Sequence, residues 1–171
     1  MSISLKQFAG SVVAPVDDAT WYEFIYGKAG FFKGCEPSFV SDNVIHITAG
    51  YGVIQGRVFE IEAEDIAVDL SNTDTLGRLK VVVDTTDAST PISFESETAS
   101  GSLPALTQQD INGSGTIFEL AVATYDVGST AISNMVDARV VLYSPQVSYG
   151  STDLVAGTDP LATGSFYFVY E

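Results

Sequence analysis

Residues 50–65 read GYGVIQGRVFEIEAED, and this stretch decides how the chain folds. Its glycines, Gly50, Gly52 and Gly56, form the pattern G-x-G-x-x-x-G, one residue longer than the dinucleotide-binding fingerprint. The residues that follow favour a strand, whereas a phosphate-binding loop must lead into the N-terminus of a helix. We therefore expect the glycines to provide a turn and a strand bulge, where glycine tolerates a positive φ angle.

The second half of the stretch carries a row of carboxylates. Apolar and acidic side chains alternate with the two-residue period of a strand, which places Glu60, Glu62 and Glu64 on one face. From Ile66 onward the apolar set has the opposite parity, so a bulge or turn must lie near residues 64–65. A pair of these glutamates would suit a glycosidase, but an exposed row lacks the apolar pocket that keeps a catalytic acid protonated. We expect a solvated strand face.

Composition argues against several classes of partner. The 171 residues include 22 acidic and 7 basic side chains, and the net charge of −15 repels nucleic acid phosphates and anionic lipid. We therefore expect no nucleic acid and no membrane among the partners. The sequence has no apolar run of the ~18–20 residues that a membrane helix needs, and no signal peptide is evident. The single Cys35 allows no internal disulfide, so we expect a chain made in a reducing compartment and not exported.

Short β-branched and aromatic runs, separated by segments rich in Gly, Ser, Thr and Asp, predict a mainly β fold. Their spacing is typical of an antiparallel β-sandwich, either jelly-roll-like or Greek-key. The expected strands are 44–48, 53–63, 66–70, 78–84, 91–98, 116–125, 137–143 and 165–170.

A short N-terminal α-helix is expected over residues 17–26. Asp17 or Asp18 would cap it, and Gly27 would end it. Three apolar side chains share one face of this helix: Trp21, Phe24 and Ile25. The predicted domains are an N-terminal arm with the helix, residues 1–36, and the sandwich, residues 37–171.

The sequence offers little for catalysis. His46 is the only histidine, and its neighbours Ile45 and Ile47 point to the opposite face, so we expect His46 on the solvent side or at an interface. No nucleophile-elbow, zinc-protease or CxxC motif is present. We expect no enzyme activity, no cofactor and no bound metal, with calcium binding by the Asp-bearing turns at 69–74 and 84–87 left open.

Aromatic residues are the remaining candidates for a functional surface. The segment GSFYFVYE at 164–171 is either a strand buried on both faces or an aromatic surface shared with other subunits. The same alternatives apply to WYEFIY at 21–26 and to the phenylalanine pair at 31–32. The candidate interface residues are Trp21, Tyr22, Phe24, Phe31, Phe32, Phe166, Tyr167, Phe168 and Tyr170.

Several segments together resemble structural proteins of tailed bacteriophages and prophages. They are an acidic pair ahead of the aromatic helix, GFFKG at 30–34, GYGVIQGRVFEI at 50–61 and LPALTQQDINGSGTIFELAVATYDVG at 103–128. The resemblance extends over about residues 17–143. It implies a tail, baseplate or fibre-associated part of the virion without catalytic residues.

The resemblance implies a non-enzymatic protein, made in the host cytoplasm, that assembles with itself and with other virion proteins. The aromatic segments independently favour a homo-oligomer, and the resemblance implies a trimer. Two alternatives remain open. The first is a head-fibre or capsid-decoration protein, and the second is a carbohydrate-binding or host-attachment module that binds host-surface glycan through Trp21, Tyr51 or Tyr149.

Overall fold

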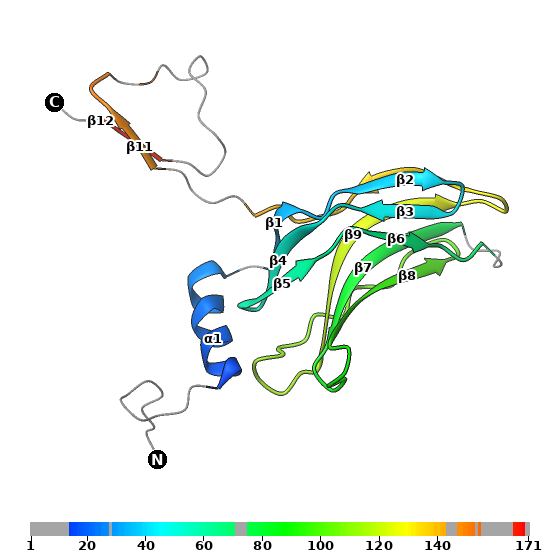
Figure 1. Cartoon of the computed structure of the whole chain (residues 1–171), viewed down its shortest axis with the longest axis horizontal. Coiled ribbons are helices and arrows are strands. Elements are labelled where there is room, and N and C mark those ends of the chain that lie inside the picture. Colours follow the sequence, from blue (N-terminus) through cyan, green and yellow to red (C-terminus); the bar gives the residue numbers. More distant parts are fainter. Residues whose placement is uncertain are drawn as a thin grey trace. The chain divides into compact units, whose positions relative to one another are not determined.

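The computed structural model describes residues 14–27, 29–70, 75–142, 147–152, 154 and 166–169 of the chain. The chain divides into two compact units, Met1–Val140 and Val141–Glu171, which we describe separately. The first unit contains the helix α1 (Pro15–Tyr26) and three antiparallel sheets, and the second contains a two-stranded sheet (Figure 1). The fold is therefore mainly β with a short N-terminal helix, which confirms the expected fold class.

Three sheets form the first unit. One has the strand order β1-β4-β5, with bounds Gly30–Gly34, Gly50–Ile54 and Arg57–Ile61. Another has the order β2-β3-β6, with bounds Pro37–Ser41, Val44–Ile47 and Glu64–Ala67. The four-stranded sheet has the order β10-β9-β7-β8, with bounds Ile132–Asp137, Ile117–Val127, Leu76–Asp84 and Ile92–Ala99.

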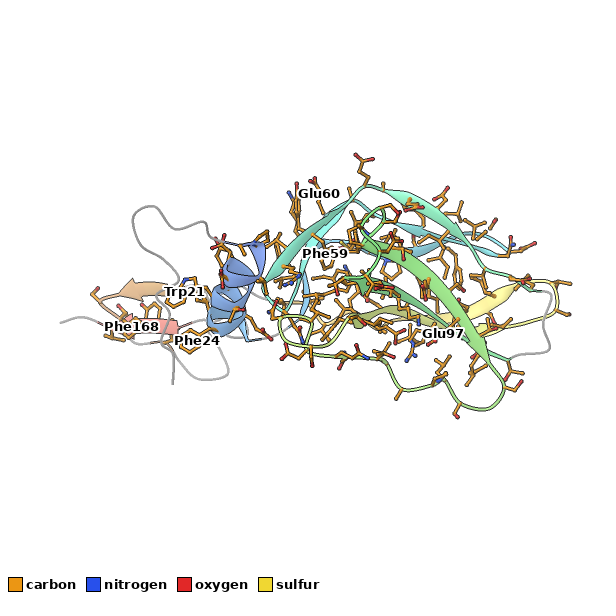
Figure 2. The ribbon with its side chains drawn as sticks, turned by 90° about the horizontal axis from the view of Figure 1, so that it is seen from below. Trp21, Phe24, Phe59, Glu60, Glu97 and Phe168 are labelled. Atoms are coloured by element: carbon orange, nitrogen blue, oxygen red, sulfur yellow. The ribbon has the colours of Figure 1, made fainter. Side chains whose placement is uncertain are left out.

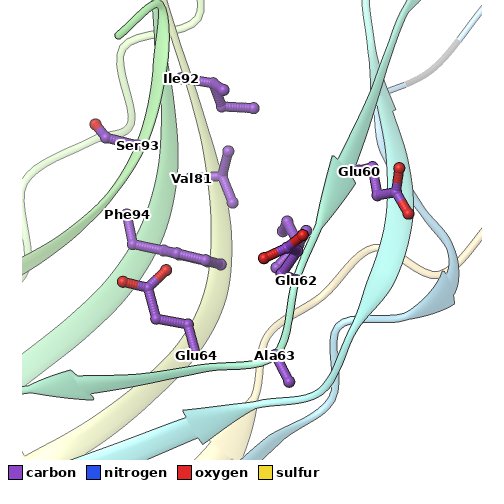
Figure 3. Close-up of a pocket in the computed structure, with 9 residues that line it drawn as sticks. Glu60, Glu62, Ala63, Glu64, Val81, Ile92, Ser93 and Phe94 are labelled. Atoms are coloured by element: carbon purple, nitrogen blue, oxygen red, sulfur yellow. The ribbon is translucent and has the colours of Figure 1, made fainter.

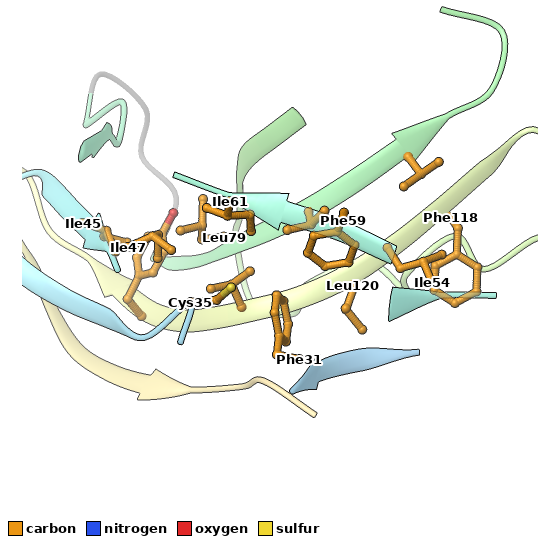
Figure 4. Close-up of a cluster of buried hydrophobic side chains, with 14 of the residues drawn as sticks. Phe31, Cys35, Ile45, Ile47, Ile54, Phe59, Ile61, Leu79, Phe118 and Leu120 are labelled. Carbon is orange, nitrogen blue, oxygen red and sulfur yellow. The ribbon is translucent and has the colours of Figure 1, made fainter. Parts of the chain in front are cut away.

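A hydrophobic core lies between the four-stranded sheet and the two three-stranded sheets (Figure 4). Alternate residues of each strand supply it, because successive side chains of a strand point to opposite faces. From one layer come Phe31, Ile45, Ile47, Ile54, Phe59 and Ile61, and from the other Leu79, Val81, Leu120 and Val122. Two layers that share one core make the unit sandwich-like.

The stretch at 50–65 is a hairpin followed by a change of sheet. β4 and β5 pair through a two-residue turn, in which Gln55 and Gly56 both have positive φ, 45° and 77°. This is the geometry that a tight hairpin requires, and it confirms the turn expected at the glycines. Beyond Ile61 the chain leaves this sheet and enters β6, which pairs with β3. The parity change is thus a passage from one sheet to another, through the two residues at 62–63.

Three of the expected strands are wrong in their bounds. The strand expected at 66–70 is β6, which begins at Glu64 and ends at Ala67. Residues 53–63 are not one strand, because the turn at 55–56 divides them into β4 and β5. The strand expected at 137–143 is wrong, because β10 covers Ile132–Asp137 and residues 138–142 belong to no named strand, while residue 143 is outside the described residues. β1 and β2 were not expected, because glycines flank the first and the second begins with a proline and is mostly exposed.

The helix α1 is two residues longer than expected. It begins at Pro15, a favourable first position because proline has no N–H to leave unpaired. Ala14 is the N-cap, and the Asp17 carboxylate accepts a hydrogen bond from the Ala14 N–H at 3.3 Å, so neither Asp17 nor Asp18 is the cap. Gly27 ends the helix as expected, in the left-handed conformation with a φ of 60°.

The second unit contains β11 (Val147–Gly150) and β12 (Phe166–Val169), which pair in parallel. β12 falls within the strand expected at 165–170, whose end residues Ser165 and Tyr170 are outside the described residues. The division between units falls after residue 140, whereas we expected a domain boundary after residue 36. β1, which precedes residue 36, is already part of a sheet with β4.

Candidate interaction surface

The helix α1 packs on the β4–β5 hairpin through its smallest side chain. Ala19 is only 3 % exposed, and it faces the hairpin turn at Gly56. A Cβ atom on Gly56 would lie 1.8 Å from the Ala19 carbonyl oxygen and 2.7 Å from the Glu23 nitrogen, so only glycine permits this approach. Asn112 adds a polar link, because its Nδ2 donates to Glu23 Oε2 at 2.7 Å and to the Gln55 carbonyl at 2.9 Å.

This packing turns the large apolar side chains of α1 outward. We define the α1 aromatic face as Trp21, Tyr22, Phe24 and Ile25, all of which are exposed. Phe24 is 82 % exposed and Trp21 57 %, and their rings stack with centroids 6.0 Å apart. Figure 2 shows both side chains on the side of the helix away from the sheets. The residues expected on one helix face are therefore together, and that face is open to solvent.

The phenylalanine pair in β1 is split between core and surface. Phe31 is 1 % exposed and packs edge-on against Phe59, with ring centroids 5.9 Å apart. It is therefore not an interface residue, which corrects our expectation. Phe32 is 47 % exposed, and it is the unpaired residue at the irregularity where the register of β1 on β4 shifts between Phe31 and Lys33.

The candidates in the second unit differ in how much of them is accessible. Phe168 is exposed, whereas Tyr167 is half-buried and its hydroxyl donates to the Thr152 carbonyl at 2.8 Å. Phe166 begins β12, and Tyr170 lies outside the described residues. Phe168 thus remains the clearest candidate in this unit.

A second aromatic group lies on the outer face of the β1-β4-β5 sheet. The rings of Phe32 and Tyr51 are nearly parallel, at 17°, with centroids 6.2 Å apart. The Tyr51 hydroxyl donates to Glu60 Oε1 at 2.6 Å, and Lys33 Nζ lies 5.9 Å from the centre of the Tyr51 ring. The hydrogen bond to Glu60 and the negative charge of that carboxylate both raise the pKa of Tyr51. This group combines two adjacent aromatic rings with charged groups of both signs.

Sequence reasoning missed a buried ionic cluster on the outer face of the four-stranded sheet. Arg78 and Lys80 of β7 and Glu119 of β9 are each more than nine-tenths buried. Lys80 Nζ bonds to Glu119 and lies 3.4 Å from Glu97 Oε2, and Arg78 pairs with Glu97. In the sequence, Arg78 and Lys80 alternate with Leu79 and Val81. This pattern is typical of a strand whose charged face is exposed, so it did not indicate that the basic side chains are buried.

The segment before β9 covers this cluster. Arg78 Nη2 donates to the Pro104 carbonyl at 2.8 Å, and the Thr107 N–H donates to Glu119 Oε2 at 2.6 Å. Burial raises the pKa of Glu119, but the hydrogen bonds from Lys80 and Thr107 outweigh it and leave that pKa below its usual value. Because Arg78, Lys80 and Glu119 are ion-paired and buried, and Arg78 and Glu119 also bond to the backbone of this segment, the cluster attaches the segment to the sheet.

The residues considered for catalysis are dispersed. His46 faces away from the core, as expected, with its Nδ1 2.6 Å from Asp65 Oδ1. Cys35 is fully buried, which raises the pKa of its thiol despite the nearby Arg139. Glu60, Glu62 and Glu64 are all exposed, as expected, but they do not share one strand face, because β5 ends at Ile61 and Glu64 begins β6 in another sheet (Figure 3).

The described residues hold no group of three or more histidine, cysteine, aspartate or glutamate side chains that could bind a metal ion. In the turn at 84–87, Asp84 and Asp87 accept hydrogen bonds from Thr86 and Ser89, which lower the pKa of both carboxyl groups. Of the other turn considered for calcium, residues 71–74 lie outside the described residues.

Comparison of the sequence with protein-family models and with curated proteins finds no match. In the part of the chain that the structure describes, no helix has the length and apolar character needed to cross a membrane.

Proposed function

We propose that this chain is a non-enzymatic structural component of a bacteriophage particle, associated with the tail, baseplate or fibre. In this role it is made in the host cytoplasm, becomes part of the virion and assembles with itself and with neighbouring virion proteins. Two things support the proposal. The sequence segments described above resemble such proteins, and the α1 aromatic face offers a surface for assembly.

The α1 aromatic face is the observation that carries the proposal. Four neighbouring large apolar side chains are exposed on one short helix, although the same helix buries an alanine. Contiguous exposed apolar patches of this kind mark interaction sites, and aromatic residues are enriched where such sites are buried. A second chain that covers this face would remove the apolar surface from water.

A self-assembled trimer is the state that we propose, and its number of subunits rests on the resemblance. The charge of −15 on each chain opposes association, so the contact must bury apolar groups and leave most carboxylates in solvent. Salt screens this repulsion. Raising the salt concentration should therefore strengthen assembly.

Light scattering coupled to size-exclusion chromatography tests the assembly. The wild-type chain should show a mass that is a multiple of 18.1 kDa and that increases with protein and salt concentration. The double variant Trp21→Gln/Phe24→Gln keeps the charge and the helix propensity but removes two exposed rings. Burial of these two partly exposed side chains is worth roughly 3 kcal/mol, so association should weaken by more than about a hundredfold.

Phe39→Gln is the control, because Phe39 is also an exposed aromatic, at 45 %, and lies on β2, outside the α1 aromatic face. This variant should associate like the wild type. A wild-type mass of 18.1 kDa under all conditions would contradict self-assembly. An equal loss of association in Trp21→Gln/Phe24→Gln and in Phe39→Gln would contradict assembly through α1.

A second candidate function is binding of host-surface glycan, and the Phe32–Tyr51 pair favours it. The nearly parallel rings of exposed Phe32 and half-buried Tyr51 can stack on the apolar face of a sugar, while the Glu60 carboxylate can accept hydrogen bonds from hydroxyl groups. Binding of the wild-type chain to a glycan array, lost in Phe32→Ser but kept in Phe39→Ser, would support this function. Glycan turnover that disappears in Glu60→Gln or Glu62→Gln would instead show an enzyme.

A further inference from the structure

The side chain of Asn112 joins three segments of the first unit. Its Nδ2 donates to Glu23 Oε2 of α1 at 2.7 Å and to the Gln55 carbonyl of the β4–β5 turn at 2.9 Å. Its Oδ1 accepts a hydrogen bond from Arg57 Nη1, at the start of β5. An amide suits this position because it carries two N–H donors and an acceptor oxygen at the same end. A carboxylate in its place could donate to neither Glu23 nor Gln55.

The residue after Asn112 is Gly113, and the two form the single Asn-Gly pair in the sequence. Because glycine has no Cβ, its nitrogen can reach the Cγ atom of the preceding asparagine with the least hindrance. When this nitrogen loses its proton and attacks Cγ, a five-membered succinimide ring forms. The bond from Cγ to Nδ2 breaks, and the Nδ2 group takes up a proton and leaves as ammonia. Water then opens the ring to an aspartate or an isoaspartate, so an amide has become a carboxylate with water as the only co-reactant.

The folded structure restrains this reaction without hiding the site. Gly113 is exposed and Asn112 is half-buried, so water has access to both. The Gly113 N–H donates to the Asp110 carbonyl at 3.2 Å and to Asp110 Oδ1 at 3.0 Å, and it must leave both acceptors before its nitrogen can attack. The negative charge of the Asp110 carboxylate also disfavours loss of the proton from that nitrogen. Docked α1 restrains the reaction further, because Glu23 holds the Nδ2 group that must leave.

Deamidation would oppose the contact that Asn112 makes with α1. The new carboxylate would face the Glu23 carboxylate and the Gln55 carbonyl, and none of these groups can donate a hydrogen bond to another. The two carboxylates would also repel each other. On the hairpin side, Arg57 would keep a charge-assisted hydrogen bond to the modified residue, and the Ile111 N–H donates to Gln55 Oε1 at 2.8 Å. The modified loop therefore stays on the hairpin, and α1 loses its polar link to both.

We propose that Asn112 is a site of spontaneous deamidation, and that its conversion to a carboxylate releases α1 from the β4–β5 hairpin. Docked α1 slows the reaction, and the reaction undocks α1. The release is irreversible, because the ammonia is lost. This modification limits how long α1 keeps its orientation on the hairpin, whether or not the α1 aromatic face binds other copies of the chain.

Hydrogen exchange of the full chain tests the release. The variant Asn112→Asp introduces the product of deamidation directly. The amides of residues 19–26 in α1 should exchange at least about tenfold faster in this variant than in the wild type, because repulsion replaces a hydrogen bond to a charged group. The second change Glu23→Gln returns a donor to this contact. The double variant Asn112→Asp/Glu23→Gln should therefore recover the slow exchange of the wild type.

Asn134→Asp is the matched control for this experiment. The Nδ2 of Asn134 also donates to a carboxylate oxygen, Asp126 Oδ2, at 2.8 Å, but this contact joins β10 to β9 and does not involve α1. The same chemical change at Asn134 should therefore leave exchange in α1 as it is in the wild type.

Peptide mapping by mass spectrometry tests the modification itself. In wild-type protein incubated at mildly alkaline pH, Asn112 should deamidate before Asn43 and Asn134, neither of which precedes a glycine. Deamidation of Asn112 should be severalfold faster in Gly56→Ala, whose new Cβ atom would overlap the backbone of α1. Gly101→Ala, whose Cβ atom would have no neighbour within 4 Å, should deamidate at the wild-type rate.

Four results would overturn the proposal. The first is equal exchange of α1 in Asn112→Asp and in the wild type, and the second is exchange that Glu23→Gln does not slow again. The third is faster exchange in β7 and β9 as well as in α1, because it would show a general loss of stability. The fourth is deamidation of Asn112 that is no faster than that of Asn43 and Asn134, since the site would then be unreactive.

Discussion

Replacement of Gly56 by alanine should separate α1 from the hairpin while the sandwich stays folded. The new Cβ atom would lie 1.8 Å from the Ala19 carbonyl oxygen, and backbone atoms cannot relieve this overlap by rotating a side chain. The positive φ of 77° adds a backbone cost of about 1–2 kcal/mol for alanine. If the helix moves away, the Asn112–Glu23 hydrogen bond is lost, which costs about another 1–3 kcal/mol. We expect a total cost of about 2–5 kcal/mol, of which the backbone part strains the hairpin and the rest weakens the attachment of α1.

The tryptophan fluorescence of Trp21 reports on this attachment, because Trp21 is the sole tryptophan and lies in α1. Urea unfolding followed by fluorescence should show a lower midpoint in Gly56→Ala than unfolding followed by far-UV circular dichroism, which monitors the sheets. In the wild type the two midpoints should coincide.

Gly101→Ala is the matched control. Gly101 has a similar positive φ of 88°, but a Cβ atom there would have no neighbour within 4 Å. The free energy of unfolding of this variant should fall only by the backbone cost of about 1 kcal/mol. Its fluorescence and circular dichroism midpoints should coincide. Equal losses in the two variants, with coincident midpoints in both, would refute the packing of α1 on Gly56.

Other predictions concern the ionic cluster and the core. Because hydrogen bonds from Lys80 and Thr107 hold the pKa of Glu119 below its usual value, its carboxylate stabilises the fold above the unfolded-state pKa, and this stabilisation is lost as the pH falls through the folded-state pKa. The free energy of unfolding, from urea titrations, should therefore fall less between about pH 6 and about pH 3 in Glu119→Gln than in the wild type; an equal fall would contradict the role of the cluster. Phe31→Ala should cost about 3–5 kcal/mol, because it leaves a cavity in the core, and Phe32→Ala about 1 kcal/mol, the value of a surface aromatic pair. Similar costs for the two would show that the division of this pair between core and surface is wrong.

The alternation of side chains made the sandwich predictable. Leu79, Val81 and Val83 recur at every second position of β7, and His46 lies between two buried isoleucines on β3. This pattern depends only on which face of a strand meets the core, so it is visible without tertiary information. The hairpin at 50–61 was partly hidden, because a Gln-Gly turn between two apolar runs gives a weaker signal than an Asn-Gly turn.

The orientation of α1 was not predictable from the sequence. Trp21, Phe24 and Ile25 form the apolar face by periodicity, which favours burial against the domain. The helix instead packs on the hairpin at Ala19. The backbone of α1 lies so close to Gly56 that no room is left for an aromatic ring between them. That choice depends on a contact between residues far apart in the sequence, which no local pattern records.

The ionic cluster escaped detection for a related reason. Arg78 and Lys80 lie at outward-facing positions of β7, where charged residues are usually solvated. They are buried because the segment around Pro104 and Thr107 folds over them, and loop placement is a property of the whole fold. Cross-strand pairing with Glu97 became evident only with the register of β7 and β8.

The most direct test of the central claim is mass spectrometry of purified phage particles from the host that carries this gene. Our account predicts that peptides of this chain band with intact particles in a density gradient, in constant proportion to the other structural proteins. It also predicts that Trp21→Gln/Phe24→Gln reduces this incorporation while Phe39→Gln does not. A chain that stays at the top of the gradient, apart from all particles, would contradict the account.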